Sequence, residues 1–243
     1  MKERIIGFDT LRGFAILLMI IDHVAAIIFS MEINEHTIRF FTRLSEPLFI
    51  LLFGYFLYKR TQKSILFRLF EIMIVAFIIN IFFYTLLNVF DILASISVFY
   101  ILFILISSPI LIFFLSFLFS YFDFTYLFFD YPISIVAMQA CIGYFMREAR
   151  ENKQVKSIFY LSLFLFFLTF FFWQKPYIYS IIFTFPALFI FMVFEKYLTN
   201  FSIWPLTSFG RYPLASYVIQ YIVIVFLAII LESYSIIDVK HLR

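Results

Sequence analysis

Long apolar runs alternate with short polar segments along almost the whole chain. A membrane-spanning helix needs about 20 mostly apolar residues, whereas barrel strands would alternate polar and apolar positions, which these runs do not. The pattern therefore predicts helices. The expected spans are residues 10–30, 45–58, 68–89, 92–107, 109–122, 131–146, 157–173, 178–194 and 212–232.

The segment 92–122 is either one long helix or two short helices broken near Ser107-Ser108-Pro109. Proline removes a backbone donor and disfavours helix before it, so the motif favours a turn. With two helices, 13 of the 18 Lys and Arg residues lie on the cytoplasmic side, and the other five lie outside: Arg39, Arg43, Lys175, Lys240 and Arg243. The positive-inside rule then favours about nine spans (8–10), with a cytoplasmic N terminus flanked by Lys2 and Arg4.

Composition supports a membrane protein. The chain is 65% hydrophobic and 14% charged over 243 residues, against roughly 45–50% and about 25% in soluble domains. This excludes a soluble enzyme and a nucleic-acid-binding protein. We expect an all-α, polytopic transmembrane bundle with residues 1–243 as a single domain in the cytoplasmic (cell) membrane. Residues 1–30 do not resemble a cleavable signal, and the lone Cys141 is expected to serve packing.

The first span holds the residues that are hardest to explain in lipid, namely Arg12, Asp22 and His23. Ionisable side chains within a membrane are costly and mark functional sites by default. Arg12 and His23 are eleven residues apart, so a helix puts them on nearly the same face. Plainer interpretations stay open: Arg12 as an interfacial anchor or an ion-pair partner of Asp9, and His23 as an interhelix hydrogen-bonding residue. Neighbouring side chains lie about 100° apart on a helix, so Asp22 and His23 do not naturally bond to each other.

Several motifs resemble a known family when they are taken in order. They are Leu11-Arg12-Gly13-Phe14 with His23, Glu46-Pro47-Leu48-Phe49 with Phe53-Gly54-Tyr55, Asp130-Tyr131-Pro132 with Gly143-Tyr144, and Gly210-Arg211-Tyr212-Pro213-Leu214 with Tyr217. Together they resemble the transmembrane acyltransferase superfamily, which includes the acyltransferase-3 and heparan-α-glucosaminide N-acetyltransferase-like proteins. Residues 21–23 and 42–49 also resemble its short TraX-like branch. Gln220 stands where many relatives have a second histidine, so a second catalytic histidine is not expected.

The resemblance implies transfer of an acyl group, usually acetyl, from cytoplasmic acetyl-CoA to a hydroxyl or amine of a carbohydrate, lipid or protein acceptor. His23 would be the general base, or would itself accept the acetyl group transiently, with Asp22 orienting or stabilising the imidazolium. Arginine and lysine suit the CoA phosphates, and the expected ligands at the cytoplasmic mouth are Arg12, Arg211, Arg68, Arg60 and Lys63.

Other functions remain open. The cationic residues can also merely enforce topology, which for Lys63 is at least as good an explanation. The same polar residues would suit a transporter or flippase, or an assembly factor without activity. No metal-ligand spacing is present, so no metal site is expected. The bilayer is the partner that the sequence predicts, and oligomeric state is not predicted.

Overall fold

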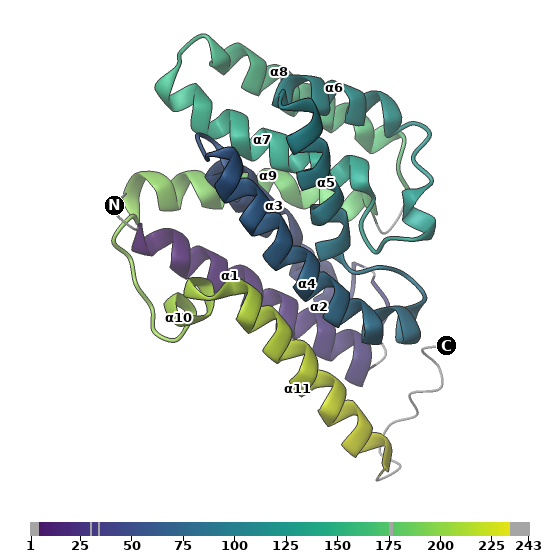
Figure 1. The fold of residues 1–243 in the computed structure, drawn as a ribbon. Coiled ribbons are helices and arrows are strands. Elements are labelled where there is room, and N and C mark those ends of the chain that lie inside the picture. The colour runs from purple at the N-terminus through teal and green to yellow at the C-terminus, as the bar shows by residue number, and fades with distance from the viewer. Residues whose placement is uncertain (1–4, 30, 34, 175–176, 234–243) are drawn as a thin grey trace. The chain divides into compact units, whose positions relative to one another are not determined.

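Helices form almost all of the regular structure in the computed structural model, which describes residues 5–29, 31–33, 35–174 and 177–233 (Figure 1). The predicted all-α fold is therefore confirmed. The α-helices are α1 (Ile6–His23), α2 (Ile38–Thr42), α3 (Ser45–Leu57), α4 (Gln62–Leu87), α5 (Ile92–Ile106), α6 (Pro109–Phe119), α7 (Ile133–Glu151), α8 (Val155–Leu168), α9 (Tyr177–Tyr197), α10 (Leu206–Arg211) and α11 (Pro213–Ser233). A π-helical turn η1 (Val24–Ile28) extends α1, and the 3-10 turns η2 (Thr125–Leu127) and η3 (Thr169–Phe171) complete the order.

Every predicted span contains a helix, but not all of these helices are long. Among the residues that the structure describes, five stretches are long and apolar enough to cross a membrane: Ile6–Ile28, Ile38–Leu57, Gln62–Ile81, Tyr177–Tyr197 and Pro213–Leu231. Three shorter apolar helices, Ile92–Ile106, Pro109–Phe119 and Val155–Phe171, accompany them. These lengths are compatible with an integral, multi-pass membrane protein. The count of nine spans and the cytoplasmic N terminus stay predictions, and Lys2, Arg4, Lys175, Lys240 and Arg243 lie outside the described residues.

The break predicted within residues 92–122 is confirmed. α5 ends at Ile106, and Ser107 adopts a left-handed backbone conformation with a φ of 54°. The Ser108 hydroxyl accepts a hydrogen bond from the backbone N–H of Leu111, so Ser108 caps α6, whose first residue is Pro109. Serine before a helix and proline at its first position are both favourable start signals. Two helices therefore occupy this segment.

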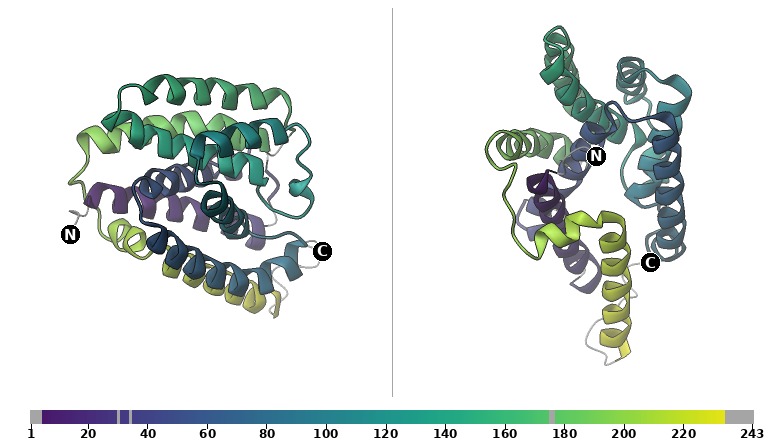
Figure 2. Two further views of the ribbon diagram at one scale, coloured as in Figure 1. Left: turned by 45° about the horizontal axis from the view of Figure 1, so that its top comes forward. Right: turned by 60° about the vertical axis from the view of Figure 1, so that its left-hand side comes forward.

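The chain forms two compact units. Unit 1 comprises residues 1–49 and 183–243, and unit 2 comprises residues 50–182. A single domain over residues 1–243 stays a prediction. In unit 1, α1 packs against α10 and α11 (Figures 1 and 2).

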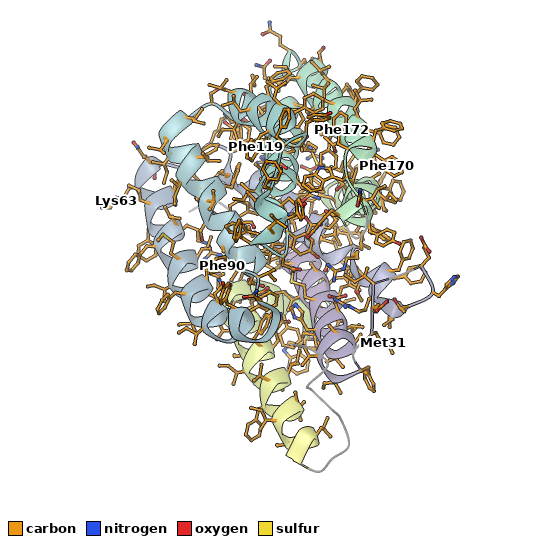
Figure 3. All side chains as sticks on the ribbon, turned by 90° about the vertical axis from the view of Figure 1, so that its right-hand side faces the viewer. Met31, Lys63, Phe90, Phe119, Phe170 and Phe172 are labelled. Carbon is orange, nitrogen blue, oxygen red and sulfur yellow. The ribbon has the colours of Figure 1, made fainter. Side chains whose placement is uncertain are left out.

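In unit 2, α7 is the central helix and packs against α5, α6 and α8. Its residues from Ile135 to Ile142 are all fully buried. Gly54 of α3 and Gly143 of α7 allow backbone contact, because a Cβ on them would lie 1.8 Å from the Ala140 carbonyl oxygen and 2.2 Å from that of Leu51. Small residues commonly permit such close helix approach in membranes. Large apolar side chains such as Phe119 and Phe172 lie on the outside of this unit (Figure 3), as expected for a lipid-facing surface.

Candidate functional site

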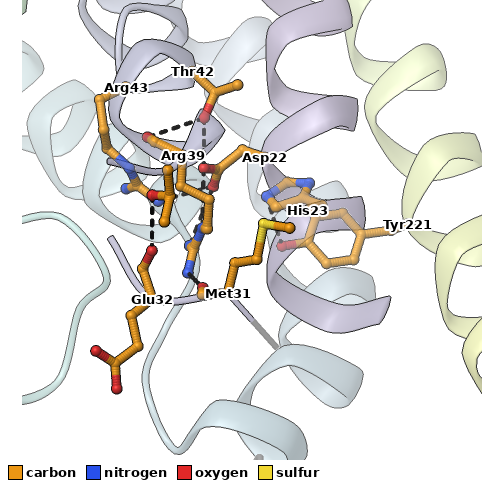
Figure 4. Close-up of polar contacts among 9 residues, drawn as sticks. Asp22, His23, Met31, Glu32, Arg39, Thr42, Arg43 and Tyr221 are labelled. Carbon is orange, nitrogen blue, oxygen red and sulfur yellow. Dashed lines mark hydrogen bonds and ion pairs between the residues drawn. The ribbon is translucent and has the colours of Figure 1, made fainter. Parts of the chain in front are cut away.

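Asp22, near the end of α1, is the centre of a buried ionic cluster (Figure 4). Its carboxylate lies 3.2 Å from Arg39 Nε and 2.8 Å from Arg43 Nη2, and accepts a hydrogen bond of 2.7 Å from the Thr42 hydroxyl. Arg39 also donates a hydrogen bond of 2.7 Å to the Met31 carbonyl oxygen. Because two guanidinium groups bind one carboxylate, the cluster anchors α2 and the segment before it to α1.

His23 follows Asp22 directly, but its imidazole lies against α11. Its Nε2 is 3.4 Å from the Tyr221 hydroxyl, and the His23 ring centroid is 4.7 Å from that of Tyr221 and 6.4 Å from that of Tyr217. Figure 4 shows the imidazole facing Tyr221, while the Asp22 carboxylate faces the arginines. The sequence prediction that neighbouring side chains diverge here agrees with this arrangement. The hydrogen bonds described for the Asp22 carboxylate come from Arg39, Thr42 and Arg43. The role of Asp22 in orienting His23 stays a prediction.

The second ring nitrogen of His23, the buried Nδ1 atom, lacks a hydrogen-bond partner within the described residues. When Nε2–H donates to the Tyr221 oxygen, Nδ1 carries a basic lone pair, as the two imidazole nitrogens alternate as donor and acceptor. The arrangement can therefore accept a proton at Nδ1.

Gln220 adds a second unsatisfied group on α11. It lies three residues after Tyr217 and four before Ile224, both buried, so the helix puts it toward the same face. The side chain is 5% exposed, and neither its amide nitrogen nor its amide oxygen finds a partner in the described part of the chain. Buried polar groups are nearly always hydrogen-bonded, so Gln220 is an exception that packing alone does not explain.

Arg12 has its own partner. Its Nη1 lies 2.7 Å from Asp9 Oδ1, so the ion pair that the sequence left open is present. The side chain is 21% exposed. α1 is a continuous helix from Ile6 to His23, yet Arg12, in its first half, pairs with Asp9, whereas His23, its last residue, faces Tyr221.

The Arg-Gly motif of α1 and the Gly-Arg motif at the end of α10 meet in space. A Cβ on Gly210 would lie 1.7 Å from the Asp9 carbonyl oxygen and 2.8 Å from the Gly13 backbone nitrogen. A Cβ on Gly13 would lie 1.8 Å from the Leu206 carbonyl oxygen. Arg12 and the exposed Arg211 therefore flank one backbone contact, at the end of unit 1 that contains the beginning of α1.

The remaining predicted cationic ligands belong to unit 2, around the beginning of α4. Arg60 donates through Nε to the Phe56 carbonyl oxygen at 2.8 Å, and Arg68 Nη1 lies 2.7 Å from Glu71 Oε2. Lys63 is exposed in the first turn of α4. Two of these three cations thus already serve local contacts.

The same end of unit 2 is fastened by contacts between the ends of α3 and α7. Arg147 donates a hydrogen bond to the Tyr55 hydroxyl, and Lys59 pairs with Glu151. The hydrogen bond to Glu151 raises the pKa of Lys59, and the same bond lowers the pKa of the Glu151 carboxyl. Lys59 and Glu151 therefore lie at the same end of unit 2, which is compatible with two helices in residues 92–122.

The sequence prediction missed several members of the site. The sequence prediction places Arg39 and Arg43 outside the membrane and gives Thr42 no role, although Arg39 and Arg43 are spaced one helical turn apart after a polar stretch. The signal for Tyr217 and Tyr221 was their four-residue spacing in an apolar helix. Neither spacing reveals which helix the side chains contact.

These features define a class of protein: a membrane-type helical protein with a polar site between α1 and α11. Comparisons of the chain with protein-family models, curated proteins and solved structures found no match. Among the described residues, no group of three or more His, Cys, Asp or Glu side chains is placed to hold a metal ion.

Proposed function

We propose that this protein is an integral-membrane acyltransferase that moves an acyl group, in the simplest case acetyl, from cytoplasmic acyl-CoA to a hydroxyl or amine. The observation that carries the proposal is the contact between Gly13 and Gly210. It joins the two motifs on which the family resemblance depends, although almost 200 residues separate them. The contact brings Arg12 and Arg211 to one end of unit 1, where they would bind the CoA phosphates.

Further along α1, His23 would supply the base. In the proposed reaction the acceptor oxygen or nitrogen attacks the thioester carbonyl carbon, and His23 Nδ1 takes the acceptor proton. The carbon–sulfur bond then breaks, and the proton passes to the CoA sulfur as free thiol. The Tyr221 hydroxyl 3.4 Å from Nε2 would hold the required tautomer. General-base catalysis of this kind typically contributes about 10²–10⁴-fold.

The distribution of charge supports a cytoplasmic donor. In unit 1, Arg12 and Arg211 belong to the end that contains the beginning of α1, whereas Arg39 and Arg43 bind Asp22 near its other end. We place the first end in the cytoplasm, because the proposed nine-span arrangement puts 13 of the 18 Lys and Arg residues on that side. This orientation would give Arg12 and Arg211 access to CoA, and the proposed location is the cytoplasmic membrane.

Acetyl-CoA binding and CoA release by protein purified in nanodiscs test the proposal. The variant with both Arg12→Ala and Arg211→Ala should bind acetyl-CoA at least roughly tenfold more weakly, because hydrogen bonds to charged groups are lost. Lys153→Ala, at an exposed loop position in unit 2, is the matched control and should bind as the parent does. Absence of saturable acetyl-CoA binding by the parent protein would refute the acyltransferase proposal.

A transporter or flippase is the second candidate. The unsatisfied atoms of His23 and Gln220 favour it, because intramembrane polar groups also line substrate and proton paths. Proton or lipid movement in sealed vesicles that depends on His23, without acetyl-CoA binding, would support this alternative.

A further inference from the structure

A cavity of about 430 Å³ opens in unit 2 between the segment after α6 and the segment that joins η3 to α9. Small-ligand sites typically enclose about 300–1,000 Å³. Seven of its ten lining residues are aromatic, among them Tyr121, Tyr126, Phe172, Trp173 and Tyr177. None of the ten belongs to the residues proposed for acyl transfer, so the inference drawn from this cavity is independent of that proposal.

The rings around the cavity present both faces and edges. Tyr121 and Phe172 meet edge to face at a centroid distance of 5.6 Å, and Trp173 contacts Tyr177 in the same way at 5.6 Å. Aromatic faces carry partial negative charge and attract the positive edges of other groups. Ring faces combined with tyrosine hydroxyls therefore suit a ligand that has C–H surfaces as well as polar atoms.

Trp173 has a hydrogen-bond donor without an acceptor among the described residues. The residue is 9% exposed, and its Nε1 atom is buried without a hydrogen-bond acceptor in the described part of the chain. The indole N–H is a donor only, and a buried donor without an acceptor is unfavourable. A ligand oxygen can satisfy it, whereas an ammonium group cannot, because it has no lone pair.

Asp123 is a lining residue of the cavity, but its carboxylate is buried and bound to other groups of the protein. Its Oδ1 accepts a hydrogen bond of 2.8 Å from the Thr125 backbone N–H, and its Oδ2 accepts one of 3.1 Å from the Ser134 backbone N–H. The carboxylate is 4% exposed as a residue and serves the loop and the beginning of α7. A cationic ligand would therefore find no exposed carboxylate among the lining residues, and an anionic ligand would lie near the buried one, so the cavity favours a neutral ligand.

We propose that this cavity binds a neutral, hydroxylated ring of the pyranoside class, as a free glycoside or as the headgroup of a glycolipid. The C–H faces of the sugar would stack on the rings, and a hydroxyl or ring oxygen would accept the Trp173 hydrogen bond. Tyr126 and Phe172 are 40% and 44% exposed. The Tyr126 ring packs edge to face against the Trp173 ring, with centroids 6.3 Å apart. Exposed side chains change rotamer within nanoseconds, so rotation of the Tyr126 ring would open a path from the cavity to the indole.

The position of the cavity agrees with a site at a membrane surface. It adjoins the beginning of α7 through Asp123 and Ser134, while the Lys59–Glu151 pair marks the other end of that helix. Tyrosine and tryptophan also gather at membrane interfaces simply as anchors. The experiment must separate a binding site from such an anchoring belt.

The chain contains two tryptophans, which makes Trp173 a direct reporter. Trp204 is 81% exposed and belongs to unit 1, so the Trp204→Phe protein in nanodiscs leaves Trp173 as the sole indole. Titration with methyl β-D-glucopyranoside should shift its emission saturably, with a dissociation constant in the millimolar range or tighter. Incorporating a glucosyl diacylglycerol into the nanodisc should shift the emission in the same direction if the ligand is a lipid headgroup.

Substitutions then assign the binding to the cavity. Tyr126→Ala should abolish the emission change, whereas Tyr160→Ala, an exposed tyrosine of α8 outside the cavity, should leave it intact. Trp173→Phe keeps a ring and removes the donor, so calorimetry should find binding about fivefold weaker. The proposal is overturned if neither sugar probe changes the emission, if Tyr126→Ala leaves the change intact, or if choline alone produces it.

Discussion

Arg43 Nη2 lies 2.8 Å from Asp22 Oδ2, so a residue just after α2 is joined directly to the end of α1. Both residues are buried, Arg43 at 6% and Asp22 at 8% exposure. Removal of one partner from a buried ion pair typically costs about 3–5 kcal/mol, because the other charge remains without compensation. This pair therefore holds the segment between α1 and α3 in place.

The first prediction concerns this pair. Asp22→Ala should lower the free energy of unfolding by about 3–5 kcal/mol, and adding Arg43→Met should cost less than the sum of the two single changes, because they share one interaction. Reversible unfolding in detergent, with Lys153→Ala as an exposed control, measures this coupling. Additive effects would show that the two side chains act independently.

The second prediction concerns the backbone contact at Gly210. Gly210→Ala places a methyl group 1.7 Å from the Asp9 carbonyl oxygen, so α10 must move away from α1. We expect a loss of about 1–3 kcal/mol, as for other overpacked sites. Ala215→Val adds bulk at an exposed position of α11 and should change the melting temperature little. Equal stability of Gly210→Ala and the parent would contradict the close contact.

The third prediction concerns catalysis. His23→Gln should lower acetyl transfer by about 10²–10⁴-fold, because the base is lost. Tyr221→Phe removes only the hydroxyl that holds Nε2, and we expect a loss of about tenfold, since one hydrogen bond contributes roughly 0.5–1.5 kcal/mol. The rate of CoA thiol release measures both variants. Full activity of His23→Gln would exclude His23 as the base.

The fourth prediction concerns pH. The lowered pKa of Glu151 means that its pairing with Lys59 stabilises the fold above the ordinary carboxyl value of 4.5, and that this contribution is lost as the pH falls through the lowered pKa. The raised pKa of Lys59 means that the pair persists below 10.5 and is lost as the pH rises through the raised value. Both groups are exposed, so the effect is small. Melting temperatures of the parent and Glu151→Gln should differ most between these limits and converge in acid.

The fifth prediction concerns topology. Cys141 is fully buried, so an impermeant maleimide should report only on an introduced cysteine. A cysteine replacing Lys153 should be labelled from the cytoplasmic side, and one replacing Tyr126 from the other side, if two helices within 92–122 both cross the membrane. Labelling of Lys153→Cys from outside intact cells would contradict the nine-span arrangement.

The sequence predicted the helices because each is a local property of the chain. Apolar runs of sufficient length form helices in lipid, since every backbone group must be satisfied within the segment. The Ser107-Ser108-Pro109 break was equally readable, because a serine cap and a first-position proline act within one helical turn. The short helices α2 and α10 were not predicted, because neither is long or apolar enough to resemble a span.

Parts of the candidate site could also be predicted from neighbouring residues in the sequence. Charge in an apolar helix identified Arg12, Asp22 and His23, and the i to i+3 spacing of Asp9 and Arg12 predicted their ion pair, which the structure confirms. Their longer-range partners required tertiary structure. Asp22 and His23 are adjacent in the chain, yet one binds two arginines and the other faces Tyr221 across nearly 200 residues.

Sequence alone therefore indicated a membrane environment, the helices and the residues that are unexpected in lipid. Hydropathy and spacing could indicate them because both depend only on residues that are near one another in the chain. Tertiary structure decided which of those residues meet. The Gly13–Gly210 contact, the partners of Asp22 and the aromatic cavity beside Trp173 arise from packing between distant segments, and helical spacing along one segment carries no information about the segment that lies against it.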